Sequence, residues 1–164
     1  MNKVWLITAI AFAAGTVMVP AQAASGTTCA VSSLSTLAFV YDPSLSIPTD
    51  SIASMTLVCS RNGGPSSITI SIGAGVSATS GGISPRQMRG ISSGDLMTYN
   101  LYRDAGRSLI LGQTNGIDTF TVLVSGIPNN GNKTVPITLW GRVPALQPVG
   151  VGNYADSVVI TVMP

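Results

Sequence analysis

Apolar and polar residues alternate with a period of two through much of this 164-residue chain, and the alternating runs end at clusters of Gly, Pro, Asn or Ser. Such alternation is typical of strands that bury one face. In Ile68-Thr69-Ile70-Ser71-Ile72, three isoleucines share one face and the hydroxyl side chains share the other. No segment has a convincing helical period. The pattern therefore predicts an all-β fold of antiparallel strands.

Turn residues divide the chain into several short strands. Besides 68–72, strands are expected at residues 53–60, 96–102, 118–124, 134–143 and 153–164. Pro136 cannot donate to a strand ladder, so it predicts an edge or a bulge near the start of its strand. We predict surface loops at 73–94, which carries Arg86 and Arg89, and at 144–152. Around seven short strands in a single domain favour an immunoglobulin-like β-sandwich.

The N-terminus has the features of a secretory signal peptide. A charged start that includes Lys3 is followed by the apolar run 4–14 and by the small-residue site Ala21-Gln22-Ala23. We predict a signal peptide at 1–23 and one mature domain at 24–164; cleavage after Ala13 is the alternative. Because the apolar run is too short for an ordinary membrane span, we expect an exported, soluble protein.

Two cysteines, Cys29 and Cys59, are expected to form a single structural disulfide, because the compartments outside the cytoplasm are oxidising. A reactive thiol pair is disfavoured because the cysteines are distant in sequence and the chain has no histidine to activate them. Cys59 shares its apolar face with Met55 and Leu57, which places the bridge against the core.

Charged residues make up 9% of the chain, against about 25% in ordinary soluble domains. The eight basic residues are spread along the sequence, without the clustering that a phosphate backbone requires, so no nucleic-acid partner is expected. A surface with so little charge also has little repulsion between copies. Such a surface is consistent with packing into an extracellular assembly. It is equally consistent with an exported domain that is simply rich in Ser and Thr.

Catalytic chemistry is hard to build from this composition. The chain has no His and no Glu, which removes the commonest general base and the commonest metal ligand. Nearly all of the six aspartates sit beside Gly, Pro, Ser or Asn, where Asp normally serves turns. No spacing of the EF-hand type is present for calcium. We therefore predict no enzymatic activity, no cofactor and no metal site.

The C-terminal stretch 153–164 reads as a long apolar strand. Unpaired backbone groups at a sheet edge are either shielded or used to recruit a strand from another chain. The alternation itself leaves both possibilities open, a strand central in its own sheet and an edge that accepts a foreign strand.

Several short motifs follow one another in the order found in spore coat protein U domains, and the chain resembles that family over 29–164. These motifs are Cys29-Ala30-Val31, Leu37-Ala38-Phe39, Tyr41-Asp42-Pro43, Leu57-Val58-Cys59-Ser60, Tyr99-Asn100-Leu101-Tyr102-Arg103-Asp104-Ala105, Trp140-Gly141-Arg142-Val143-Pro144 and Gly152-Asn153-Tyr154-Ala155-Asp156-Ser157.

The resemblance implies a subunit of an archaic chaperone-usher pilus or of a coat, with an incomplete immunoglobulin-like sandwich that lacks its last strand. Its implied partners are a periplasmic chaperone, an outer-membrane usher and neighbouring pilus subunits. The chaperone would fill the groove first, and a neighbouring subunit would then replace it by strand addition. Carried onto this chain, the groove residues would be Val158, Ile160 and Val162 of the last strand, with Val31 and Phe39. The alternative is that these five are ordinary residues of a closed core.

Two further expectations concern the role of the subunit. Residues 24–28 alone separate the predicted cleavage site from Cys29, and so short an arm cannot donate a strand. The subunit would then accept a strand without offering one. The competing function is an adhesin that recognises a glycan or an abiotic surface through the loops at 83–91 and 144–150.

Overall fold

The structure is a computed structural model, and it describes residues 7–13, 27–61, 67–78, 81–124, 127 and 131–163. Its regular elements are the strands β1 (Ile7–Ala13), β2 (Thr27–Leu34), β3 (Leu37–Phe39), β4 (Thr49–Arg61), β5 (Ser67–Ile72), β6 (Arg86–Gly90), β7 (Leu96–Tyr102), β8 (Phe120–Leu123), β9 (Asn132–Val143), β10 (Tyr154–Ala155) and β11 (Ser157–Met163). In these ranges no helix has the length and apolar character needed to cross a membrane.

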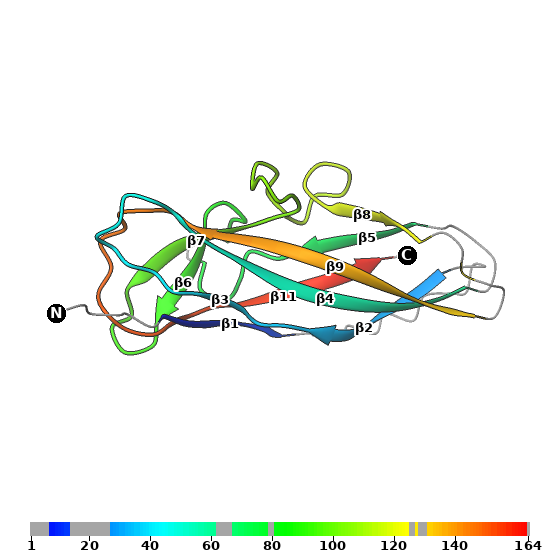
Figure 1. The fold of residues 1–164 in the computed structure, drawn as a ribbon, viewed down its shortest axis with the longest axis horizontal. Helices are drawn as coiled ribbons and strands as arrows, with labels where there is room; N and C mark the ends of the chain where they lie inside the picture. The colour runs from blue at the N-terminus through cyan, green and yellow to red at the C-terminus, as the bar shows by residue number, and fades with distance from the viewer. Residues whose placement is uncertain are drawn as a thin grey trace.

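The strands form two sheets that pack into an elongated sandwich (Figure 1). The first sheet has the order β3-β1-β11-β5-β8, and the second has the order β10-β6-β7-β9-β4-β2. Neighbouring strands are antiparallel except for β1 and β11, which run parallel. The chain is thus an all-β domain of the two-sheet immunoglobulin-like kind, as the alternation predicted.

The core lies between the sheets and is built from the alternating faces that the sequence indicated. Ile68, Ile70 and Ile72 of β5 are all buried, and they face the buried Met55 and Leu57 of β4 within one apolar cluster. Each such side chain removed from water contributes about 1.5 to 3 kcal/mol. These buried faces fix the strand register, because a shift by one residue would turn the apolar side chains to solvent.

Two segments of the chain change sheets. β2 pairs with β4 in the second sheet, and β3, which follows it directly, belongs to the first. β10 pairs with β6 in the second sheet, and β11 continues into the first after Asp156. The two crossings place β3 and β11 on either side of one position in the first sheet.

The structure corrects two expectations. The loop predicted at 73–94 contains β6, whose Arg86 is wholly buried while Arg89 is exposed. The strand predicted at 153–164 is two strands separated at Asp156. The expectation for Pro136 is confirmed, because Pro136 lies on an edge of the sheet. It pairs with Thr56 of β4, whereas β7 pairs with β9 only at 140–142, so among the described strands Pro136 has a neighbour on one side alone.

Loss of the disulfide should weaken the fold measurably. Cys29 and Cys59 are bonded and face one another in the β2–β4 ladder, closing a loop with a sequence separation of 30. Replacing both by serine is expected to lower the free energy of unfolding by roughly 3 to 4 kcal/mol, because the unfolded chain gains conformational freedom. Urea unfolding of the double variant measures the loss. An unchanged midpoint would contradict a stabilising role for the bridge.

Candidate strand-acceptor slot

In the first sheet, β3 and β11 are neighbours of β1 and not of each other. We call the position between them, which β1 fills, the acceptor slot. β1 pairs in parallel with β11 through the register Ala11 to Ser157 and Ala13 to Val159, and antiparallel with β3 through Ile10 to Leu37. Figure 1 shows β1 (dark blue) running alongside β11 (red). Among the described strands, β1 alone connects the β3 and β11 edges.

β11 forms one wall of the slot and has two distinct faces. Val158 and Ile160 are buried, whereas Val159 is 49% exposed and Met163 is 38% exposed. The opposite edge of β11, at 160–163, pairs with β5. The edge that faces the slot is paired with β1 at 157–159. The strand therefore joins the sandwich through β5 and offers its other edge to the occupant of the slot.

β3 forms the second wall and is held by packing onto β9. Leu37 and Phe39 are buried above Gly141, where an added Cβ would collide with both side chains. Gly141 thus allows the two sheets to approach closely at this point. Since these contacts involve β9 and not β1, they hold the β3 wall against the second sheet independently of what fills the slot.

The structure places two of the five predicted groove residues directly beside β1. Phe39 and Val158 lie on the two strands that flank β1, and Ile160 and Val162 continue along β11. Val31 lies instead on β2 of the second sheet, which comes close to β11 further along. Val31 and Val162 are half-buried and pack against the core, whereas the other three residues are buried.

Sequence reasoning missed two components of the slot. Leu37 is as deeply buried as Phe39, and the alternation in Leu37-Ala38-Phe39 could have identified it. The occupant β1 was assigned to a removable signal peptide, although its segment 7–13 also has the length and apolar content of a strand. A local pattern cannot separate the two uses of such a run.

The switch between β10 and β11 is fixed by a buried carboxylate. Asp156 is 2% exposed and accepts hydrogen bonds from the Tyr99 hydroxyl at 2.7 Å and from the Ser77 backbone N–H at 2.9 Å. Burial and the neighbouring Asp156 carboxylate both raise the pKa of Tyr99. Because Asp156 immediately precedes Ser157, these bonds set where β11 begins and hence its register along the slot.

Strongly alkaline solution should destabilise the protein through Tyr99. A phenol whose pKa is raised in the folded state stabilises the fold fully below the unfolded value of about 10, and this contribution falls above that pH, where the unfolded chain ionises first. The slope is about 1.4 kcal/mol per pH unit for one such group. We expect urea midpoints measured from pH 8 to 11.5 to fall above about pH 10.

The Tyr99→Phe variant is the control for this prediction. It should be less stable at neutral pH, because Asp156 loses a buried hydrogen-bond donor, and its alkaline loss should be smaller. A residual loss is expected from Tyr154, whose pKa is also raised by burial. An identical pH profile in the variant would contradict the assignment to Tyr99.

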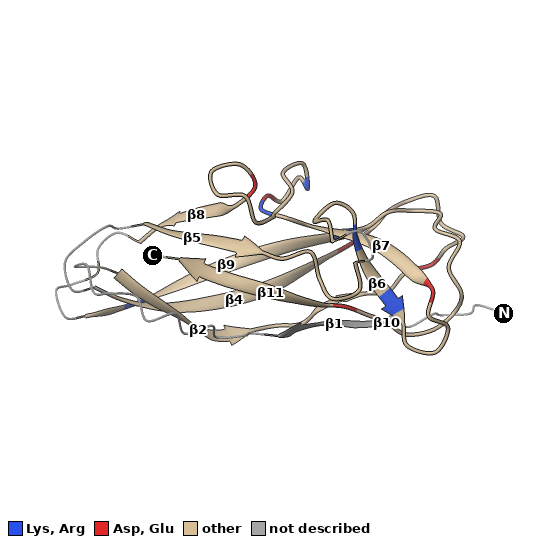
Figure 2. Cartoon of the chain, turned by 180° about the vertical axis from the view of Figure 1, so that it is seen from behind, with Lys and Arg blue, Asp and Glu red and all other residues tan. Residues whose placement is uncertain are grey.

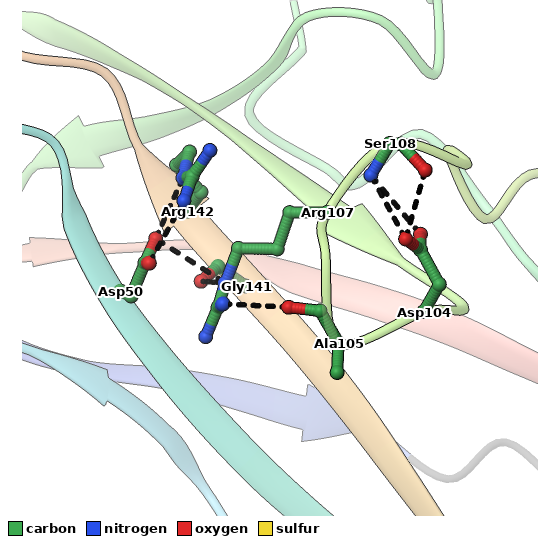
Figure 3. Close-up of polar contacts among 7 residues, drawn as sticks. All are labelled: Asp50, Asp104, Ala105, Arg107, Ser108, Gly141 and Arg142. Atoms are coloured by element: carbon green, nitrogen blue, oxygen red, sulfur yellow. Dashed lines mark hydrogen bonds and ion pairs between the residues drawn. The ribbon is translucent and has the colours of Figure 1, made fainter.

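Asp50 and Asp104 serve local structure. Asp50 accepts two hydrogen bonds from Arg142 on β9, at 2.7 and 2.9 Å, and pairs with Arg107 at 3.2 Å (Figure 3). The bond from Arg142 lowers the pKa of Asp50. Asp104 accepts from the Ser108 backbone and hydroxyl in a turn. Within the described ranges, no three His, Cys, Asp or Glu side chains are grouped to hold a metal ion.

Charged side chains do not gather over the slot. Figure 2 shows the Lys and Arg positions (blue) and the Asp positions (red) as separate short segments on a mostly tan ribbon. The walls of the slot are apolar, with Leu37, Phe39, Val158 and Ile160 all buried. The chemistry that this position can recognise is therefore an extended backbone that carries apolar side chains.

Residues 15–161 match the family model of the Spore Coat Protein U domain. The chain belongs to this family. It is 34% identical over 101 residues to Protein U of Myxococcus xanthus, an alignment that covers 59% of this chain and 52% of that protein. The chain therefore spans about half the length of the curated relative it matches.

The fold is also found in a solved structure. A chain in the crystal structure of the CsuC–CsuE chaperone–tip adhesion subunit pre-assembly complex, from archaic chaperone-usher Csu pili of Acinetobacter baumannii, superposes with a TM-score of 0.56. The match covers 84% of this chain and 40% of that chain at 19% sequence identity. At this identity the likeness establishes a shared immunoglobulin-like fold and no more.

Proposed function

We propose that this protein is a non-catalytic structural subunit of a bacterial surface fibre or coat, assembled by donor-strand complementation. It is exported through the periplasm, where a chaperone inserts a strand into the acceptor slot. An outer-membrane usher then exchanges that strand for one from a neighbouring subunit. The observation that carries the proposal is that β3 and β11 are connected through β1, a segment inside the predicted signal peptide.

Removal of residues 1–23 would leave both walls of the slot without their partner. The ladder edges of β3 and of β11 at 157–159 would lose their partners, and Phe39 and Val158 would each lose the β1 residue that lies opposite them in the register. Unpaired backbone edges and exposed apolar surface both favour the addition of a strand. Burying about five donor side chains would give on the order of 10 kcal/mol before ordering costs.

Co-expression with a candidate periplasmic chaperone tests the proposal. The processed chain is expected to form a soluble one-to-one complex and to aggregate or be degraded when the chaperone is left out. Size-exclusion chromatography and mass spectrometry of the complex give its stoichiometry, and the mass also gives the mature N-terminus. A processed chain that is a stable, soluble monomer without the chaperone would overturn the proposal.

A second candidate function is adhesion through the loops at one end of the sandwich. Figure 1 places the β3–β4 connection (cyan), the β6–β7 turn (green) and the β9–β10 connection (orange) at this end. Each carries apolar side chains that are more than 60% exposed: Ile47 at 63%, Ile91 at 70% and Leu146 at 62%. Exposed apolar residues that gather in this way favour a binding surface.

The adhesin loops differ in part from those expected. The predicted loop 83–91 is largely strand β6, so Ile91 in the following turn is its exposed apolar end. The loop 144–150 is held by Gln147, which bonds to Thr98 and to the Tyr41 hydroxyl. Binding of the chaperone complex to glycan arrays and to polystyrene tests this role. Loss of binding in Ile47→Asn/Leu146→Asn would support it, and unchanged or absent binding would contradict it.

A further inference from the structure

The segment that fills the acceptor slot is the segment that export is predicted to remove. β1 covers Ile7–Ala13, and both predicted cleavage positions, after Ala13 and after Ala23, lie beyond its last residue. Either cleavage would therefore take away the whole strand. The slot is occupied in the full chain, and cleavage at either position would vacate it.

β1 has a neighbour on each side, but over different parts of its length. It has β11 on one side, in the register Ala11 to Ser157, and β3 on the other, in the register Ile7 to Phe39. Ile7 and Ile10 pair with β3, with a register shift between them, and residues 11–13 pair with β11, so β1 links the two strands end to end along its length. In its sequence, Ile-Thr-Ala-Ile-Ala-Phe-Ala, Ile10 and Phe12 alternate with alanines over 9–13, which is the kind of pattern that strand addition uses.

We propose that the leader is a built-in occupant of the slot: in the unprocessed chain Ile7–Ala13 closes the sandwich as a strand parallel to β11, and cleavage opens the slot to a strand from a second polypeptide. This inference rests on the proposed function, because it assigns the first occupant of the same slot. Signal cleavage then decides when the subunit becomes able to accept a partner.

Disulfide trapping in the full chain 1–164 tests the occupancy and the direction of the strand. The chain is produced in the cytoplasm, out of reach of signal peptidase, and refolded under oxidising conditions. Ala13→Cys/Val159→Cys joins two positions that are in register, and Val159 is exposed. The control Ala13→Cys/Met163→Cys moves one thiol four residues along β11, about 13 Å away.

The in-register pair is expected to cross-link at least about tenfold more than the control, because a disulfide needs Cα atoms within about 7 Å. Peptide mapping distinguishes the engineered bridge from the native Cys29–Cys59 bridge. Equal or absent cross-linking of the two pairs would overturn the parallel placement of β1.

A proline at Ala11 tests whether the strand closes the fold. Ala11→Pro removes one backbone donor from the part of β1 that pairs with β11, whereas Ala11→Ser keeps the donor. In the full chain the proline variant is expected to unfold roughly 10 °C lower than the serine variant. It should also bind the chaperone, which the parent full chain and the serine variant should not do. Equal behaviour of both variants would contradict the inference.

The processed chain 24–164 separates this inference from the proposed function. If it binds the chaperone and is unstable alone, but the full chain shows no cross-link and the same chaperone binding, the slot exists and the leader does not fill it. If the processed chain is as stable alone as the full chain, the slot needs no strand and the proposed function fails as well.

Discussion

Replacing Val158 by aspartate is expected to abolish strand acceptance, whereas the same change at Val159 should leave it nearly intact. The two residues are adjacent on β11, but Val158 is wholly buried beside the slot and Val159 is 49% exposed on the opposite face. An inserted strand would force the Val158→Asp carboxylate into an apolar site without a partner, at a cost of about 3 kcal/mol or more. This lowers chaperone affinity by at least about 100-fold.

Pull-down and titration with the chaperone measure this difference, with Val159→Asp as the matched control. Because Val158 also contacts the core, Val162→Asp is a second test: Val162 is half-buried further along β11, so a charge there should weaken binding without unfolding the domain. Wild-type affinity in both Val158→Asp and Val162→Asp would show that β11 does not line the binding site.

Replacing Arg86 by methionine is expected to lower the free energy of unfolding by about 4 kcal/mol or more. The side chain is fully buried and donates to the carbonyl oxygens of Ile72 at 2.9 Å, Gly73 at 2.8 Å and Leu111 at 2.7 Å, and also to Ile83 at 3.2 Å. Methionine fills much of the volume but removes the guanidinium donors from the carbonyls of Ile72, Gly73 and Leu111, and each buried acceptor left unpaired costs about 1 to 3 kcal/mol.

Arg89→Met is the control for Arg86→Met. Arg89 lies on the same strand, is exposed, and makes one long bond, to the Gly94 carbonyl at 3.3 Å, so its loss should cost less than about 1 kcal/mol. Arg86→Lys should also be strongly destabilising, because a single ammonium has three donors and cannot reproduce the guanidinium fork. Urea unfolding at neutral pH compares the three variants. Equal losses at 86 and 89 would contradict the bonding role of Arg86.

The strands that sequence reasoning predicted are those in which local pattern and burial agree. In β5 the three isoleucines alternate in the sequence and are all buried, and β7 was predicted with its observed bounds. β6 was missed because an arginine occupies a core position. Arg86, Met88 and Gly90 are the buried face of that strand, and neither Arg86 nor Gly90 carries an apolar signal.

The arrangement of the strands depends on contacts that no local pattern encodes. The single strand predicted over 153–164 changes sheets at Asp156 because Tyr99 and Ser77, distant in sequence, bind its carboxylate. The position of β1 between β3 and β11 could not be predicted from the sequence either, because strand alternation identifies which face is buried and not which strand is the neighbour along each edge. The family resemblance implied an open strand position, and we propose that it is the position that β1 fills in this structure.

The two crossings between sheets have a mechanical consequence for a strand held in the slot. A strand between β3 and β11 lies along the long axis of the sandwich, and each of its walls continues into the second sheet through β2 or β10. Tension along the strand would load its hydrogen bonds together in shear, and the load would pass to both sheets. In the second sheet, the Cys29–Cys59 disulfide joins β2 to β4. Forced rupture of such a joint is governed by its unfolding rate, so it would resist sustained pulling.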